Sequence, residues 1–290
     1  MLIERLRESD TKLYRPALET LRTLIRTSTS SMTSVPKPLK FLHPHYPALQ
    51  ALYETWPVSD DKSLFADILS VLAMTYSDTQ PRGTLRYRLL SASLQPSSPL
   101  SEPGSWGHEY VRHLAAELGE EYNSRELDEA GVEKESEEES PVPGTVDDLR
   151  NLAIECATFL LQHNAEPDAV DLLEELEIVD KIVDIVDENT YERVCQYMIR
   201  CVNLLPPPDD VSFLRTAHRI YAKHNKFPQA LALSIRLGDQ DLMRKDFNAP
   251  ANPMMKKQLA FLLARAQVPR ELLEAPAEDG MDDGETELPE

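Results

Sequence analysis

His163-Asn164-Ala165-Glu166-Pro167-Asp168-Ala169 returns 61 residues later in the chain as His224-Asn225-Lys226-Phe227-Pro228-Gln229-Ala230. The apolar residues that follow each copy keep the same register, so that Leu172 corresponds to Leu233 and Leu176 to Leu237. Asparagine at the end of a helix tolerates the left-handed conformation. Proline fits the first turn of the next helix because its missing N–H would have no partner there. Each copy therefore predicts a corner between two helices.

A repeat of this length holds about four helices, which form two hairpins of about thirty residues each. In tetratricopeptide-like solenoids such helix pairs bury their apolar faces only against their neighbours. The first half of the chain also carries apolar residues at helical spacing, as in the stripe Leu64, Ile68, Val71 and Leu72. No convincing period-two alternation bounded by hairpin turns accompanies them. We predict an all-α fold, a helical-hairpin solenoid or α-α superhelix, with no toroid in these residues.

The net charge of −20 is concentrated in two segments. Residues 117–139 hold eleven acidic residues against two basic ones, and residues 271–290 hold nine acidic residues and no basic one. Self-repulsion and few apolar residues predict disorder in both places. We expect four regions: an N-terminal helical block (1–122), an acidic disordered linker (123–144), a solenoid of two four-helix units (145–267) and an acidic disordered tail (268–290).

Composition argues against several classes of protein. No apolar run is long enough for a membrane span, and the first residues carry charges where a signal peptide would be apolar. The folded remainder is close to neutral, which argues against nucleic acid as a partner. Cys156, Cys195 and Cys201 match no metal spacing and lie in helical apolar patterns, as expected of small buried residues in a reducing compartment.

The sequence offers no catalytic constellation. His163 and His224 occupy equivalent positions at predicted helix ends, where an imidazole satisfies the last carbonyl groups. His108 and His113 are five residues apart and diverge around a helix, which makes them poor ligands for one metal ion. No phosphate loop, nucleophile elbow or zinc-protease motif occurs. We expect no enzymatic activity, no metal and no cofactor.

One basic cluster is a candidate for partner binding. Arg82, Arg86 and Arg88 lie close together in a chain that is acidic overall. The alternative interpretation is an ordinary solvated helix face.

Several long strings resemble one family in the same order along the chain. They include Leu13-Tyr14-Arg15-Pro16-Ala17-Leu18-Glu19 and Ser105-Trp106-Gly107-His108-Glu109-Tyr110-Val111-Arg112-His113-Leu114-Ala115, together with residues 31–42, 66–75, 163–166 and 171–173. Over residues 11–267 the chain is similar to the N-terminal region of the smaller of the two large non-ATPase scaffold subunits of the 26S proteasome regulatory particle base. These subunits form the proteasome/cyclosome-repeat family.

The resemblance implies a non-catalytic scaffold that is attached to the proteasomal ATPase ring and other regulatory-particle subunits, in the cytoplasm and nucleus. It also implies docking of ubiquitin, ubiquitin-like shuttle factors and a deubiquitinase in ubiquitin-dependent degradation. The glycine-punctuated toroid that carries the family's best-known docking surfaces is not expected within this sequence. A weak ubiquitin contact on the exposed face of residues 146–267 is a secondary hypothesis. The alternative is a helical-repeat adaptor of another intracellular complex.

Overall fold

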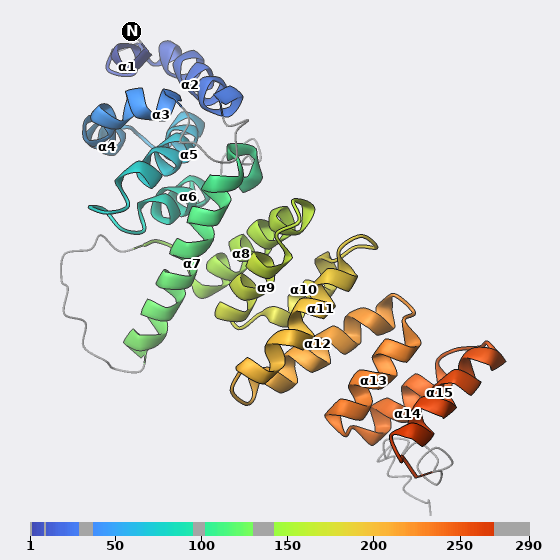
Figure 1. Cartoon of the computed structure of the whole chain (residues 1–290). Coiled ribbons are helices and arrows are strands. Elements are labelled where there is room, and N and C mark those ends of the chain that lie inside the picture. Colours follow the sequence, from blue (N-terminus) through green and yellow to red (C-terminus); the bar gives the residue numbers. More distant parts are fainter. Residues whose placement is uncertain (1, 9, 29–36, 95–101, 130–141, 270–290) are drawn as a thin grey trace, which may run out of the picture. The chain divides into compact units, whose positions relative to one another are not determined.

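The computed structural model describes residues 2–8, 10–28, 37–94, 102–129 and 142–269. Every regular element in these ranges is a helix, and no strand occurs in them, which confirms the all-α prediction (Figure 1). The most extensive contacts between helices are all made by helices that follow each other in the chain, as expected for a helical solenoid. The chain divides into two compact units, residues 1–185 and residues 186–290.

The first unit contains ten α-helices and five short 3-10 helices within its described residues. They are α1 (Leu2–Arg5), η1 (Thr11–Leu13), α2 (Tyr14–Ser28), α3 (Lys37–Leu42), η2 (His43–His45), α4 (Tyr46–Thr55), α5 (Asp60–Ala73), η3 (Met74–Tyr76), α6 (Gly83–Ser93), η4 (Pro103–Trp106), α7 (His108–Glu129), α8 (Val146–Gln162), α9 (Glu166–Glu175), η5 (Val179–Lys181) and α10 (Ile182–Ile185).

Helix α5 is the centre of the first half of this unit. Ser59 caps it by accepting a hydrogen bond from the Lys62 N–H at 3.1 Å, and two aspartates in its first turn suit the positive end of the helix dipole. Every residue from Ser63 to Ala73 is buried. A helix that is buried all round needs neighbours on every side. Helices α2, α4 and α6 supply them.

The second unit contains five α-helices and one 3-10 helix within its described residues. They are α11 (Tyr191–Cys201), η6 (Val202–Leu204), α12 (Asp209–Lys223), α13 (Phe227–Leu237), α14 (Gln240–Asn248) and α15 (Pro253–Arg265). Helix α13 packs against α12, α14 and α15. A buried polar pair also joins α12 to α14, because His218 Nε2 lies 2.8 Å from Asp246 Oδ2 and both side chains are under a tenth exposed.

The two helix corners have the geometry that their sequences predict. Asn164 and Asn225 both adopt left-handed backbone, with φ of 59° and 55°. The next N–H in each corner turns back to the helix, since Ala165 donates to Leu160 O at 3.0 Å and Lys226 donates to Tyr221 O at 2.8 Å. These bonds satisfy carbonyl groups that the ends of α8 and α12 would otherwise leave unpaired. Proline then lies in the first turn of α9 and of α13.

The predicted linker differs from the structure at its start. Helix α7 continues to Glu129, so residues 123–129 are helical instead of linker. Most of the remaining linker, residues 130–141, lies outside the described residues, as does the predicted tail from residue 270. The division between the compact units falls at residues 185/186, not between residues 122 and 145. The reason is that α7 packs against both α8 and α9.

Two of the three cysteines lie in the core as expected. Cys156 and Cys195 are fully buried, and burial raises the pKa of each thiol to about 12. Cys201 is partly exposed. In the described part of the chain, no helix combines the length and the apolar character that crossing a bilayer requires.

Candidate protein-binding site

The three arginines predicted as one basic cluster point to different surroundings. Arg82 Nη1 donates to Glu121 Oε2 at 2.8 Å, and the Arg86 guanidinium lies 5.6 Å from the centre of the Tyr87 ring. Arg88 is only 4% exposed. The interpretation of all three as one solvated helix face is therefore wrong for Arg88. A role of Arg82 or Arg86 in partner binding stays a prediction.

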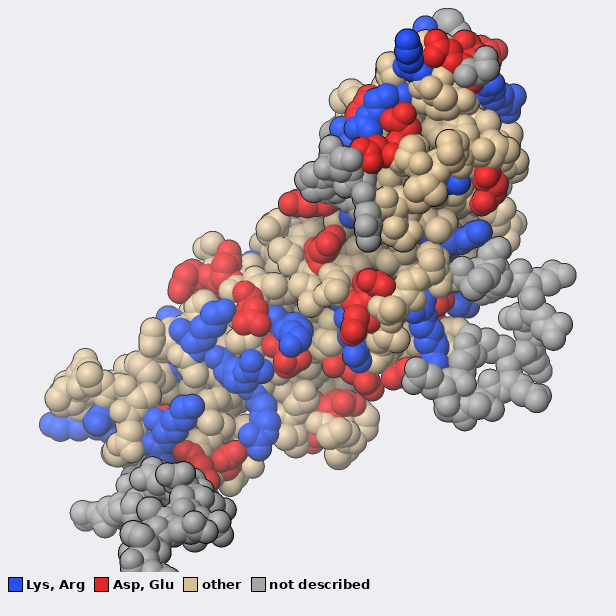
Figure 2. Space-filling view, turned by 180° about the vertical axis from the view of Figure 1, so that it is seen from behind, with Lys and Arg blue, Asp and Glu red and all other residues tan. Residues whose placement is uncertain are grey.

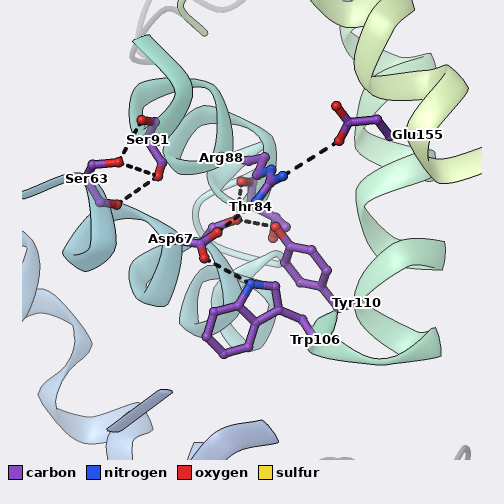
Figure 3. A network of polar contacts seen from close by, with 9 residues as sticks. Ser63, Asp67, Thr84, Arg88, Ser91, Trp106, Tyr110 and Glu155 are labelled. Carbon is purple, nitrogen blue, oxygen red and sulfur yellow. Dashed lines mark hydrogen bonds and ion pairs between the residues drawn. The ribbon is translucent and has the colours of Figure 1, made fainter. Parts of the chain in front are cut away.

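Arg88 is the centre of a buried polar network between α5, α6 and η4 (Figure 3). Its Nη1 donates to Asp67 Oδ1 at 2.9 Å, and the indole Nε1 of Trp106 donates to Asp67 Oδ2 at 3.2 Å. Both oxygens of the carboxylate thus have a donor. A buried charge pair requires such complete hydrogen bonding because water no longer solvates either group. Sequence reasoning missed Asp67, although a charged residue inside the apolar run of α5 indicates a buried partner.

Hydroxyl groups extend the network along α5 (Figure 3). Ser70 Oγ donates to Thr84 O at 2.7 Å, and the Tyr110 hydroxyl lies 2.8 Å from the same Oγ, so Tyr110 acts as the donor to Ser70. Ser63 and Ser91 exchange hydrogen bonds between α5 and α6, each hydroxyl donating to the other residue's carbonyl. Burial raises the pKa of Tyr110 far above its ordinary value. These groups hold the helices together and stay uncharged at neutral pH.

Two acidic residues of α7 bind the start of α6. Glu117 Oε2 accepts from the Leu85 N–H at 2.7 Å, which satisfies one of the unpaired donors in the first turn of α6. Glu121 accepts from Arg82 and, at 2.7 Å, from Arg125 Nε. Both carboxylates are buried. The acid-rich segment therefore begins inside the folded unit, where cationic side chains and backbone donors compensate its charge.

A groove of about 570 Å³ lies beside this network in the first unit. It is lined from α6, from Glu102 and from the N-terminal half of α8, with Arg88 at its buried side. Glu155 projects into it with a side chain 56% exposed, and its Oε2 lies 3.7 Å from Arg88 Nη2. Hydrogen bonds from Thr145 lower the pKa of Asp148, a third carboxylate of the lining, so it is ionised at neutral pH. Such a groove suits a cationic side chain of a protein.

The predicted histidines have structural contacts. His163 Nδ1 lies 2.8 Å from Phe159 O in the last turn of its own helix, as expected. The equivalent His224 differs, because its Nδ1 lies 3.1 Å from Glu188 Oε1 and its ring stacks on Tyr191. His108 and His113 diverge: His108 lies near the ring of Phe159, and His113 Nε2 is 2.9 Å from Glu117. Within the described ranges, no three metal-binding side chains converge.

A protein-family model described as the RPN1 N-terminal domain matches residues 1–287 of this chain. The chain is 51% identical over 277 residues to the 26S proteasome regulatory subunit RPN1 of Candida glabrata and covers 28% of that protein. It is 52% identical over 272 residues to rpn-1 of Neurospora crassa, again covering 28% of it. Each alignment includes 93% of this chain.

A plant relative is more distant. The 26S proteasome non-ATPase regulatory subunit 2 homolog A of Arabidopsis thaliana is 39% identical over 272 residues, which are 94% of this chain and 28% of that protein. The chain therefore spans less than a third of the length of these curated relatives.

Proposed function

The chain belongs to the family of the RPN1 N-terminal domain, and on that premise we propose that it is a non-catalytic scaffold region of the 26S proteasome regulatory particle. The observation that carries the proposal is similarity to proteasome regulatory subunits over nine-tenths of the chain. We further propose that it corresponds to the smaller of the two large non-ATPase base subunits. Its place of action is then the cytoplasm and nucleus.

The arrangement of polar groups supports a structural role. Asp67, Arg88 and Tyr110 are the kinds of residue that enzymes use, but each is at most 4% exposed and bonded to another member of the network. A catalytic group must reach a substrate. These groups instead fix how α5, α6 and α7 pack. The exposed surfaces that remain are the ones available to protein partners.

We propose that the partners are subunits of the proteasomal ATPase ring and other regulatory-particle subunits. An immobilised chain should retain the purified ATPase ring, and the matching region of the Candida glabrata relative serves as the positive control. Retention comparable to that control is the expected result. If the control retains the ring and this chain does not, the proposed attachment is wrong.

The finer proposal is that this region supports docking of ubiquitin, ubiquitin-like shuttle factors and a deubiquitinase. Any direct ubiquitin contact of a solenoid face is expected to be weak, so NMR titration of the labelled chain is the suitable measurement. Perturbed resonances confined to one face of residues 146–267 would support it. Unchanged spectra at millimolar ubiquitin would contradict a direct ubiquitin contact and leave attachment to the regulatory particle as the proposed role of this region.

A further inference from the structure

The described part of the second unit has the opposite charge to the chain as a whole. Residues 186–269 contain twelve lysines and arginines against eight aspartates and glutamates, whereas the whole chain has a net charge of −20. Figure 2 shows lysine and arginine side chains gathered on one face of this unit, at the lower left of the view. A local positive surface on an acidic protein indicates binding of a specific negatively charged partner, because the protein as a whole repels anions.

Helix α12 carries the most regular basic feature of this unit. Arg215, Arg219 and Lys223 follow each other at four-residue spacing, and all three are exposed. Side chains at this spacing lie on one helix face and together cover about 12 Å of the axis. The opposite face is buried and consists of Phe213, Leu214, Ala217, Ile220 and Tyr221. We name the three cations the α12 ridge.

The internal repeat shows that the fold does not need these charges. Helix α8 is the equivalent of α12, and its positions corresponding to the ridge hold Ile154, Thr158 and Gln162. The repeat therefore folds without these three charges at the equivalent positions, which points to a role of the ridge on the surface.

Local contacts of the ridge leave it accessible. Arg215 Nη1 lies 3.2 Å from Asp239 Oδ2, and Asp239 also caps α14 through the Leu242 N–H. The Arg215 side chain nevertheless remains 54% exposed. Lys223 is in the last turn of α12, where a cation suits the negative end of the helix dipole. All three residues of the ridge remain exposed.

We propose that the α12 ridge docks an acidic segment of a partner protein, with carboxylates at helical spacing facing the three cations. Three cations on a strongly acidic chain are a small footprint for nucleic acid, whose binding depends on neutralising many phosphates. Protein carboxylates need only local complementarity. The inference rests on the charges of the second unit and does not require the proposed scaffold role.

The test uses the full chain and a fluorescein-labelled helical peptide that has glutamate at every fourth position. Replacing Arg215, Arg219 and Lys223 together by glutamine should weaken binding about tenfold, because each exposed pair contributes up to about 1 kcal/mol. The matched control replaces Lys256, Lys257 and Arg265 of α15 by glutamine, which removes the same charge from the same unit. Fluorescence anisotropy at low and at physiological salt gives the affinities.

Three outcomes decide the inference. It holds if only the α12 variant loses affinity and if a version of the peptide with glutamine in place of glutamate does not bind the wild-type chain. It is overturned if both variants lose affinity equally, since total charge would then explain binding. It is also overturned if a single-stranded DNA oligonucleotide binds more tightly than the acidic peptide. Retention of the ATPase ring is a separate measurement, so either proposal can fail alone.

Discussion

Arg88 Nη1 lies 2.9 Å from Asp67 Oδ1, and the two side chains are only 5% and 2% exposed. This ion pair joins α6 to α5 inside the first unit, and Trp106 supplies the second donor to the carboxylate. Removing one member of such a pair leaves the other as an uncompensated buried charge. The pair is therefore a point at which a single substitution should affect the whole unit.

Replacing Arg88 with methionine should lower the free energy of unfolding by about 3 kcal/mol, because Asp67 would lose its cation while remaining buried. Urea denaturation monitored by circular dichroism measures the change. Replacing the neighbouring Arg86 with methionine is the matched control, and it should cost less than about 1 kcal/mol because Arg86 is partly exposed. The double variant Asp67→Asn/Arg88→Met should recover part of the loss. Equal costs for Arg88 and Arg86 would show that the pair contributes little.

Gly104 is required for the approach of η4 to α8. A Cβ at this position would overlap the ring of Phe159. Gly104→Ala should therefore destabilise the first unit by roughly 1–3 kcal/mol, as overpacking typically does. Phe159→Ala should relieve the overlap, so the double variant should lose less than the sum of the two single variants. Additive losses in denaturation experiments would mean that the two positions do not meet.

Asn225 should tolerate glycine but not alanine. Its φ of 55° costs an L-residue with an ordinary side chain about 1–2 kcal/mol, whereas glycine adopts it freely. Asn225→Ala should lower the melting temperature of the protein, and Asn225→Gly should leave it nearly unchanged. Asn164 at the equivalent corner should give the same pattern. A glycine variant as unstable as the alanine variant would indicate that the asparagine side chain, and not the backbone conformation, matters.

Stability should fall in alkaline solution. Burial raises the pKa of Cys156 from 9.0 to about 12, so the folded state keeps this proton over a pH range in which the unfolded state releases it. The stabilisation is complete below pH 9 and is lost between pH 9 and 12, at about 1.4 kcal/mol per pH unit. Burial likewise raises the pKa of Cys195 in the second unit to about 12.

Denaturation midpoints measured from pH 7 to 11 test this dependence. Cys156→Ala should flatten the decline in the first unit, and the partly exposed Cys201, replaced by serine, serves as the control. A thiol reagent at pH 7.5 tests the burial directly in the wild-type protein. It should modify Cys201 rapidly, and it should modify the buried Cys156 and Cys195 only on unfolding. Fast modification of all three in the native protein would contradict the burial that underlies the pKa shifts.

Local patterns predicted the helix corners, but not the polar network. The sequence from His163 to Pro167 contains everything that its corner needs, because the left-handed asparagine, the returning N–H and the proline are all within a few residues. Arg88 depends on Asp67, which is 21 residues away on another helix. Arg86 and Arg88 are two residues apart in α6, roughly 200° around the helix, so their closeness in sequence does not place them on one face.

The start of the linker, which was predicted from the density of acidic residues, was wrong for a similar reason. Glu117 and Glu121 belong to an acidic run in sequence, yet in the fold they meet the Leu85 N–H, His113, Arg82 and Arg125. Those partners come from α6 as well as from α7, so counting charges along the chain could not identify them. The acidic character of the groove was equally hidden, because Glu102 precedes η4 whereas Asp148 and Glu155 lie more than forty residues later, in α8.

The most direct measurement of the central claim is quantitative mass spectrometry of complexes purified through a tag on this protein from its own cells. A scaffold region of the proteasome regulatory particle should bring down the ATPase subunits and the other non-ATPase subunits in near-equal amounts. Recovery of those subunits at no more than the level of an untagged control would contradict the account.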